Sequence, residues 1–340
     1  MPARTGVVTG GTWCCDHNKL VEYWPPEDGI TEIISEELSG GGSACNMALD
    51  LKRLDSSFFV ETIGVVGDDA DGALILAQAD ELGVERSQLR IAPGVRTNYT
   101  DCFSSRATGR RTHIYFTGAN AVLTPDIFDF AGTRARILHL GLPGVHRLMD
   151  APWADEPNGW VAVLKKARSA GLETNMELAS VSAETLARLI RPCLPHLDLL
   201  VINDFEIGAI AGMATSEAGK TDVAACRAAA RAVMEAGSMA VLVVHFPAGA
   251  VALTRSGDVL AKPSMRVPAE EIVGANGAGD AFAAGVVYAL HEGWPLEDAV
   301  ALGHATAAAS LRGVTTTGSV LPWRECLALA ERWGWREALA

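Results

Sequence analysis

The chain has 340 residues, of which 49% are hydrophobic and 20% charged, and its formal net charge is −13. This composition is typical of a globular enzyme, and the length suffices for one large α/β domain. The acidic balance argues against nucleic acid or an anionic membrane as a partner, because both attract basic surfaces.

The cysteines and the apolar runs indicate where such a protein resides. Seven cysteines are scattered along the chain without a Cys-x-x-Cys pair, which favours neither a disulfide framework nor a zinc site. The longest uninterrupted apolar run, residues 239–244, is far shorter than a membrane-spanning helix. The first residues resemble a β-strand and not a signal peptide. We therefore expect a reducing, cytoplasmic location.

Short apolar strands alternate with amphipathic helices along the chain. After a first strand at 7–8, the pattern predicts a helix over 44–53, a strand over 58–66 and a helix over 74–82. Strand-like runs at 137–140, 199–202 and 240–245 follow, with helical runs at 161–170, 223–235, 281–291 and 296–311. Repeated β-α-β order predicts a mostly parallel sheet with helices on both faces, in one domain spanning residues 1–340.

Two segments interrupt this alternation, at about residues 12–40 and 95–118. Within both, apolar and polar residues alternate with a period of two around the turn signals PEDG and ATGR. Such alternation predicts antiparallel strands with one exposed face. We expect either a small β-sheet lid beside the main domain or a pair of surface hairpins.

The stretch GANGAGDAF, residues 274–282, leads directly into an apolar helix. It is not a dinucleotide fingerprint, because a phenylalanine occupies the place of the third glycine of GxGxxG. The amides of Gly277, Ala278 and Gly279 at the helix start form a candidate anion hole, which the helix dipole favours. Asp280 is then either the base of a phosphoryl transfer or an ordinary first-turn carboxylate.

With these residues the chain resembles the ribokinase-like (PfkB) family of carbohydrate and nucleoside kinases over nearly its whole length. The motifs in order are GGSACN at 41–46, GVVGDDADG at 64–72, GAN at 118–120, NDFE at 203–206, GAGD at 277–280, HATAAAS at 304–310 and PWRE at 322–325. Each motif is weak alone, but their order and intervals favour the family. The resemblance implies a three-layer α/β/α domain with a small β-sheet lid.

The resemblance also implies roles on the acceptor side of the site. Asp280 would be the catalytic base beside the anion hole. Asp16 would bind vicinal sugar hydroxyls, with a solvated loop aspartate as the alternative. Gly41 and Gly42 would let the backbone approach the sugar, and Asn46 would hydrogen-bond a hydroxyl.

On the nucleotide side, the resemblance implies that Asn203 and Glu206 face the phosphates of ATP and Mg²⁺. The alternatives are a helix N-cap at Asn203 and an exposed first-turn carboxylate at Glu206. Gly249 would belong to the nucleotide loop. His304 would lie near the nucleotide, or would simply be a buried helix residue. The lid would exclude water and join two chains in a homodimer.

Three positions depart from the family pattern. Gly274 and Ala275 replace an Asp-Thr pair that helps to build a potassium site in many relatives, so we expect only weak stimulation by K⁺. The nucleotide loop reads VHFPAG at 244–249, where only Gly249 matches the family. Gly141 stands where ribokinase has a ribose-contacting glutamate, so free ribose is not specially favoured and a larger substrate fits.

The sequence therefore predicts an ATP-dependent kinase that phosphorylates a hydroxymethyl group of a sugar or sugar-like substrate. A nucleoside kinase is the first alternative, in which Trp13, Tyr23 and Trp24 stack on a base or fill the lid. A catalytically weakened ligand sensor is the second alternative. The altered nucleotide loop favours this sensor, and the intact GAGD and NDFE motifs oppose it.

Overall fold

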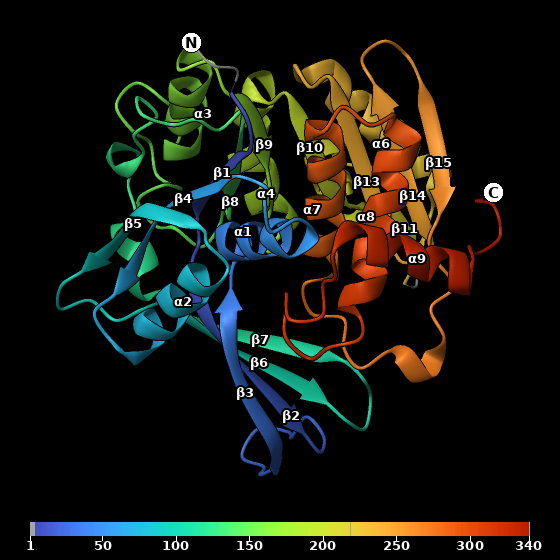
Figure 1. Ribbon diagram of the computed structural model, residues 1–340, viewed down its shortest axis with the longest axis horizontal. Helices are drawn as coiled ribbons and strands as arrows, with labels where there is room; N and C mark the ends of the chain where they lie inside the picture. The colour runs from blue at the N-terminus through green and yellow to red at the C-terminus, as the bar shows by residue number, and fades with distance from the viewer. Residues whose placement is uncertain (1–3, 218, 340) are drawn as a thin grey trace.

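A nine-stranded sheet forms the centre of the main domain in the computed structural model, which describes residues 4–217 and 219–339 (Figure 1). The strand order is β15-β14-β13-β10-β9-β8-β1-β4-β5. The seven strands from β13 to β5 are parallel, and β14 and β15 add two antiparallel strands at one edge. The strands are β1 (Val7–Gly11), β4 (Val60–Gly67), β5 (Glu85–Ala92), β8 (Ile137–Gly141), β9 (Glu173–Met176), β10 (Leu199–Asn203), β13 (Val241–Phe246), β14 (Gly249–Thr254) and β15 (Val259–Pro263).

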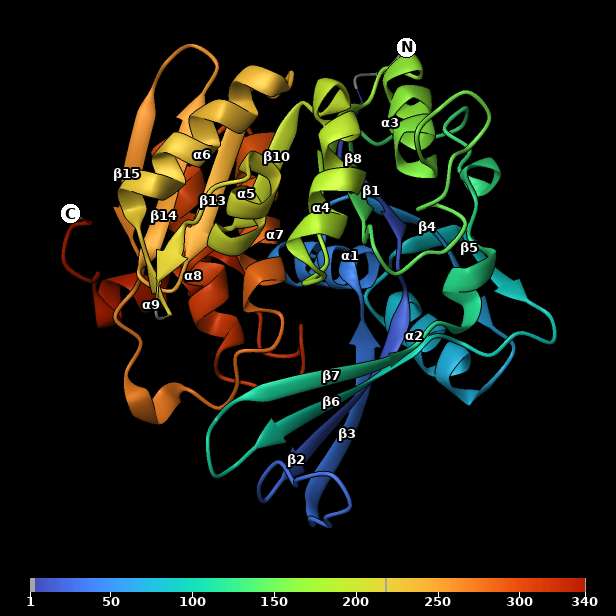
Figure 2. The same ribbon diagram turned by 180° about the vertical axis from the view of Figure 1, so that it is seen from behind.

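Helices cover both faces of this sheet (Figures 1 and 2). One face carries α1 (Ser43–Leu54), α2 (Ala70–Glu81), α7 (Ala278–His291), α8 (Leu296–Ser310) and α9 (Trp323–Trp333). The other carries α3 (Gly159–Ser169), α4 (Ala183–Ile190), α5 (Asp204–Ala211) and α6 (Val223–Ala236). Val7 and Val8 of β1 are fully buried in the first and second of these cores. The predicted three-layer architecture is thus confirmed, because apolar strands need cover on both faces.

A separate four-stranded sheet, here called the small sheet, projects from one end of the main domain (Figure 2). Its order is β3-β2-β6-β7, formed by β2 (Cys14–Val21), β3 (Ile33–Gly41), β6 (Tyr99–Ser105) and β7 (Arg111–Phe116). β2 pairs with β3, and β6 with β7, in the antiparallel manner that the period-two alternation predicts, whereas β2 and β6 run parallel. The two interrupting segments therefore form one sheet and not two independent hairpins.

Short elements complete the chain. β11 (Ser216–Glu217) pairs with β12 (Lys220–Thr221), and 3-10 turns occupy Gly118–Val122, Pro125–Ile127, Arg191–His196 and Ala269–Glu271. Across residues 4–217 and 219–339, every helix falls short of the length and apolarity that crossing a bilayer requires.

The parallel strands decide where a site can form. β1, β8, β9 and β10 end at the same edge of the sheet, so the residues that follow Gly11, Gly141, Met176 and Asn203 emerge there together. Crevices beyond the carboxyl ends of parallel strands are the usual ligand sites of open α/β sheets.

Candidate active site

One cavity of about 1030 Å³ lies at this edge, between the main domain and the small sheet. Its volume is at the upper end of the range for small-molecule sites. The predicted site residues that line it are Asp16, Gly42, Asn46, Asn203, Gly277, Ala278, Gly279, Asp280 and His304. Gly41, Glu206 and Gly249 are not among its lining residues.

Gly277 fixes the start of α7. Its φ is 72°, in the left-handed region that favours glycine, and a Cβ there would lie 2.3 Å from the carbonyl oxygen of Thr316. This close turn sets Ala278 and Gly279 as the first helical residues, and both line the cavity. First-turn amides have no carbonyl partner within their helix. The Ala278 amide makes a long hydrogen bond of 3.4 Å to the Ala275 carbonyl oxygen, which an anion in the cavity would have to replace.

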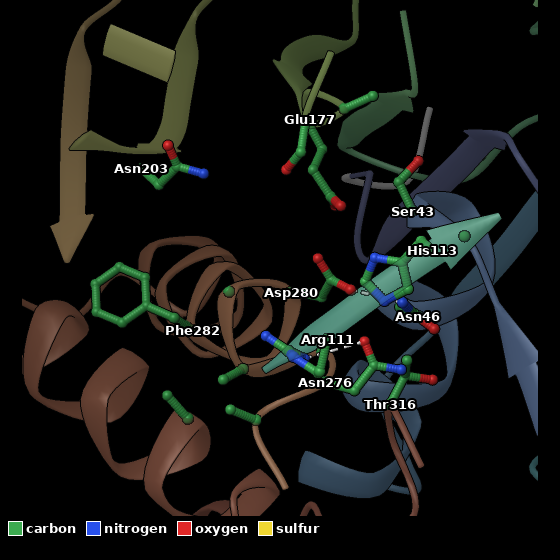
Figure 3. A pocket seen from close by; sticks show the side chains of 18 of the residues that line it. Ser43, Asn46, Arg111, His113, Glu177, Asn203, Asn276, Asp280, Phe282 and Thr316 are labelled. Atoms are coloured by element: carbon green, nitrogen blue, oxygen red, sulfur yellow. Dashed lines mark hydrogen bonds between the residues drawn. The ribbon is translucent and has the colours of Figure 1, made fainter. Parts of the chain in front are cut away.

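Asp280 lies in the first turn of α7 and faces the cavity (Figure 3). Asn46, from the first turns of α1, donates a hydrogen bond of 2.6 Å from Nδ2 to Oδ2 of Asp280. Burial and then the nearby Glu177 carboxylate raise the pKa of Asp280 well above its usual value, while the Asn46 hydrogen bond lowers it. Asp280 is thus enclosed and partnered, unlike an ordinary first-turn carboxylate.

Asp16 reaches the cavity from β2 of the small sheet. Its side chain is buried and accepts a weak hydrogen bond from Sγ of Cys14, so it is not a solvated loop aspartate. Burial raises the pKa of Asp16 to about 7. Gly41 packs against it, because a Cβ at Gly41 would lie 2.2 Å from the Asp16 carboxylate. Gly41 therefore makes room for Asp16, and Gly42 contributes to the cavity wall.

Asn203 and Glu206 begin helix α5. Oδ1 of Asn203 accepts from the Glu206 amide at 2.9 Å, and Oε2 of Glu206 accepts from the Asn203 amide at 2.9 Å. This reciprocal capping box matches the N-cap alternative for Asn203. Glu206 is buried, so it is not the exposed carboxylate of its own alternative. Asn203 also lines the cavity. The Glu206 carboxylate already accepts a hydrogen bond from the Asn203 amide.

The other predicted nucleotide-side residues are His304 and Gly249, and only His304 lies beside Phe282. His304 packs edge-on against the Phe282 ring at 5.0 Å, and burial lowers the pKa of His304 to about 3, which keeps the ring neutral. Gly249 begins β14, where a Cβ would lie 2.4 Å from the Lys262 carbonyl oxygen. His245, Phe246 and Pro247 of the same loop line the cavity in its place.

Glu177 is a cavity residue that the sequence patterns did not single out. It follows β9 directly, and its carboxylate points toward Asp280 (Figure 3). Nε2 of His139 lies 3.0 Å from Oε2 of Glu177. Burial raises the pKa of Glu177 to about 7. A residue at the carboxyl end of a parallel strand is a candidate site residue, and this position could have pointed to Glu177. The four-residue strand before it was not predicted from the sequence.

The small sheet contributes Arg111 and a group of rings that were also missed. Nη1 of Arg111 donates to Oδ1 of Asn276 at 3.3 Å, and Nδ2 of Asn276 donates to Oδ1 of Asn18 at 3.2 Å. These contacts join the loop before α7 to strands β2 and β7. The rings that line the cavity from the small sheet are Tyr99, His113, Tyr115 and Phe116.

The three aromatic residues proposed to stack on a nucleobase lie elsewhere. Trp13 is fully buried in the core and donates from Nε1 to the Thr62 hydroxyl at 2.7 Å. Tyr23 and Trp24 are exposed near the tip of the small sheet. None of the three lines the cavity, so that part of the nucleoside hypothesis is wrong.

A second cluster of candidate metal ligands lies outside the cavity. Cys15, His17 and Asp71 bring sulfur, nitrogen and oxygen atoms within 4.8 Å of one another. His17 also lies 3.5 Å from an Asp101 oxygen and stacks on Tyr99. Nε2 of His17 on β2 lies 3.6 Å from Oδ2 of Asp71 on α2.

Comparisons with known proteins agree with this fold. A model of the pfkB family of carbohydrate kinases matches residues 6–324. The chain is 27% identical over 294 residues to adenosine kinase of Schizosaccharomyces pombe, covering 81% of this chain and 80% of that protein. It is 28% identical over 311 residues to ribokinase of Arabidopsis thaliana, covering 90% and 75%. The structure of Arabidopsis thaliana ribokinase complexed with ribose and ATP matches with a TM-score of 0.76 at 20% identity, covering 96% and 98%.

These findings define a phosphotransferase of the ribokinase fold with an alcohol group as acceptor. The chain belongs to the pfkB family of carbohydrate kinases. Membership confirms the predicted family, the fold and the sugar or nucleoside kinase class, and it implies the use of ATP.

Proposed function

We propose that this protein transfers the γ-phosphoryl group of ATP to a hydroxymethyl group of a sugar or sugar-like substrate, with Asp280 as the base. The observation that carries this proposal is the position of Asp280 in one shared cavity. Asp16 and Asn46 lie on its acceptor side, and the start of α7, Asn203 and His304 lie on the side assigned to the nucleotide.

The chemistry follows from that geometry. Asp16 binds two acceptor hydroxyls, and Asp280 receives the proton of the attacking hydroxyl as its oxygen bonds to phosphorus. The bond from phosphorus to the leaving oxygen of ADP breaks in the same transfer. The amides of Ala278 and Gly279 stabilise the charge on the transferred group.

Magnesium fits the charges of the cavity. Burial raises the pKa of five carboxyl groups in and around it, namely Asp16, Asp50, Glu177, Glu206 and Asp280. A triphosphate would bring further negative charge among these carboxyl groups, and Mg²⁺ takes oxygen ligands and retains waters. Asn203, Glu177 or Glu206 would contact Mg²⁺ directly or through water, and the ion would neutralise charge on the phosphates.

A potassium site is not supported by side chains in the way that the cavity carboxyl groups support Mg²⁺. Gly274 and Ala275 offer only backbone carbonyl oxygens at the positions before the glycine-rich helix start, so the proposed enzyme works without a dedicated K⁺ site.

A nucleoside as the acceptor is the second candidate. Tyr99, Tyr115 and Phe116 line the acceptor side, and aromatic faces stack on nucleobases. Tyr99 and Phe116 stack on each other at 5.3 Å, and Arg96 lies over both rings. In the nucleoside hypothesis, these rings take the base-stacking role that the sequence suggested for Trp13, Tyr23 and Trp24.

The small sheet is proposed to act as a lid and as the contact between two copies of the chain. Its exposed apolar side chains are Ile33, Ile34 and Leu38 of β3 and Ile114, Tyr115 and Phe116 of β7. These side chains lie on the two edge strands of the small sheet, and exposed apolar edge strands are potential protein–protein contacts, which supports a homodimer. The seven buried free cysteines support a reducing cytoplasm, and the net charge of −13 supports small molecules over nucleic acid or membranes as partners.

Release of ADP from ATP and Mg²⁺ across a panel of sugars and nucleosides tests this function. We expect turnover with at least one sugar, and phosphorus NMR should place the new phosphate on a hydroxymethyl carbon. Preference for a nucleoside would favour the second candidate. Ligand-induced thermal stabilisation without turnover on any substrate would instead favour the sensor and overturn the proposed function.

A further inference from the structure

The group of Cys15, His17 and Asp71 joins the small sheet to the main domain, away from the cavity. Cys15 and His17 lie two positions apart on β2, so both side chains point to the face of the small sheet opposite Asp16. Asp71 approaches them from the first turn of α2. The ligand atoms of the three residues lie within 4.8 Å of one another. A single ion placed among them can therefore reach all three side chains.

One ring nitrogen of His17 lacks a partner. Nε2 is buried and has no hydrogen-bond partner within residues 4–217 and 219–339. It lies 3.6 Å from Oδ2 of Asp71, beyond the usual range of a hydrogen bond. With bonds of about 2.0–2.3 Å and tetrahedral angles, two ligands of one Zn²⁺ ion lie roughly 3.5 Å apart. The separation therefore fits an ion between the two atoms better than a direct hydrogen bond.

The other side of the His17 ring is held by the small sheet. Nδ1 lies 3.5 Å from Oδ1 of Asp101, and the ring stacks on Tyr99 with the centroids 5.0 Å apart. Asp101 is in turn paired with Lys19. Metal-binding histidines commonly donate their second ring nitrogen to a carboxylate, which orients the ring and leaves the lone pair of the first nitrogen for the metal. Asp101 can hold His17 in this way.

A positively charged His17 ring between Asp71 and Asp101 is the simpler alternative. It accounts for the two aspartates, but not for the thiol of Cys15, which is fully buried and meets the same two side chains. Both carboxylate oxygens of the neighbouring Asp69 already accept hydrogen bonds, so Asp69 is not a further ligand. Sulfur, nitrogen and oxygen donors thus converge on one point.

We propose that Cys15, His17 and Asp71 bind a Zn²⁺ ion, with water as the fourth ligand. Mixed sulfur, nitrogen and oxygen donors suit Zn²⁺, whereas Mg²⁺ and Ca²⁺ take oxygen ligands. On binding, the Cys15 thiol gives its proton to solvent, and the thiolate and the Asp71 carboxylate balance the charge of the ion. The side chains of His17 and Asp71 are each 19% exposed, which gives the ion a path from the surface.

This site goes beyond the proposed function, because none of its three residues lines the cavity. Its effect would be to link β2 of the small sheet to α2 of the main domain. Gln78 of α2 already accepts a hydrogen bond of 2.8 Å from the Gly40 amide of β3, and α2 lies beside the end of the small sheet (Figure 1). Asp16 lies between the two ligands on β2, so the ion would hold the backbone of a cavity residue from outside the cavity.

The first test uses Co²⁺, which takes similar ligands to Zn²⁺ and gives a sulfur-to-cobalt charge-transfer absorption when a thiolate binds it. We expect the reduced protein without nucleotide to bind one Co²⁺ per chain with this absorption, and Zn²⁺ to displace it. Cys15→Ser should lose the absorption. The control is Cys326→Ser, at a buried cysteine of α9 whose hydrogen bond to the Leu321 carbonyl a hydroxyl group can replace. It should retain the absorption.

The second test uses Asp71→Asn, which changes a partly exposed ligand and leaves the core intact. We expect its Zn²⁺ affinity, measured by competition with a chromophoric chelator, to be about tenfold or more below that of the wild type, and Asp101→Asn to lose about tenfold through the His17 ring. Zn²⁺ should raise the Tm of the wild type more than that of Asp71→Asn, because an ion that binds the folded state stabilises it. Asp298→Asn, at an exposed first-turn aspartate of α8, is the control and should match the wild type.

The outcomes decide the site without any measurement of kinase activity. A wild type that binds neither Co²⁺ nor Zn²⁺ would overturn it and favour the charged His17 ring between two aspartates. Equal Zn²⁺ affinities for the wild type and Asp71→Asn, or a charge-transfer absorption that persists in Cys15→Ser, would place the ion elsewhere and would overturn it as well.

Discussion

Asp280 is the residue on which the proposed chemistry depends most. Asp280→Asn retains the side-chain shape and the contact with Asn46 but cannot accept a proton. We expect kcat to fall by about 10³-fold or more, with little change in substrate binding, since general-base catalysis acts in the transition state. Asp298→Asn, at an exposed first-turn position of α8, is the control. Near-normal kcat for Asp280→Asn in steady-state assays would remove Asp280 as the base.

Gly41 has a more indirect effect, through Asp16. In Gly41→Ala the added methyl group would overlap the Asp16 carboxylate at 2.2 Å and displace it from the cavity. We expect KM for the acceptor to rise by about tenfold or more, because small misplacements of a binding group are costly. KM for ATP should change little.

The control for this substitution is Gly132→Ala, at an exposed glycine with no heavy atom within 4 Å of the added Cβ. It should behave as the wild type. An unchanged acceptor KM in Gly41→Ala would show that Asp16 is not a substrate contact.

At the scale of elements, the loop before α7 determines the expected response to K⁺. Its residues Gly274 and Ala275 lack side-chain oxygens, and Asn276 instead links the loop to the small sheet through Arg111 and Asn18. Hydrogen bonds thus take over the ordering of the loop. We expect K⁺ to raise the initial rate by less than about twofold over the same concentration of Na⁺, because a hard cation needs several oxygen ligands. Strong activation by K⁺ would show that backbone carbonyls suffice.

The elements predicted from sequence were those with a clear hydrophobic period. β10 and α6 follow their predicted ranges closely, because one is continuously apolar and the other strongly amphipathic. β9 was missed because ETNM has four residues and little apolar character; Thr174 and Asn175 are buried by tertiary contacts instead. Missing β9 concealed Glu177, whose importance arises from the register of β8 with β9.

The site residues also divide into those that a local sequence pattern reveals and those that it does not. Asp280 was found because glycine spacing at a helix start has a local physical meaning. The reciprocal bonds of Asn203 and Glu206, by contrast, satisfy a capping pattern that sequence reasoning had already named as their alternative. A contact such as that between Asn46 and Asp280 cannot be read from local patterns, since it joins residues 234 positions apart.

For the whole molecule, the exposed apolar side chains of the small sheet predict association. Ile114 on β7 is 54% exposed, and Ile91 on β5 of the main sheet is 50% exposed. We expect analytical ultracentrifugation to show a dimer that Ile114→Lys dissociates, because a buried lysine without a partner opposes the contact. Ile91→Lys should remain dimeric. A monomeric wild type would refute assembly through the small sheet.

The 234 positions between Asn46 and Asp280 also bear on how the protein is made. The acceptor-binding strands are synthesised first, and the glycine-rich start of α7 emerges from the ribosome only after most of the sheet exists. A nascent or truncated chain that ends before α7 therefore contains Asp16, Asn46 and Asn203 but lacks Asp280, the proposed base. Under the proposed function, such a fragment would be unable to transfer the phosphoryl group.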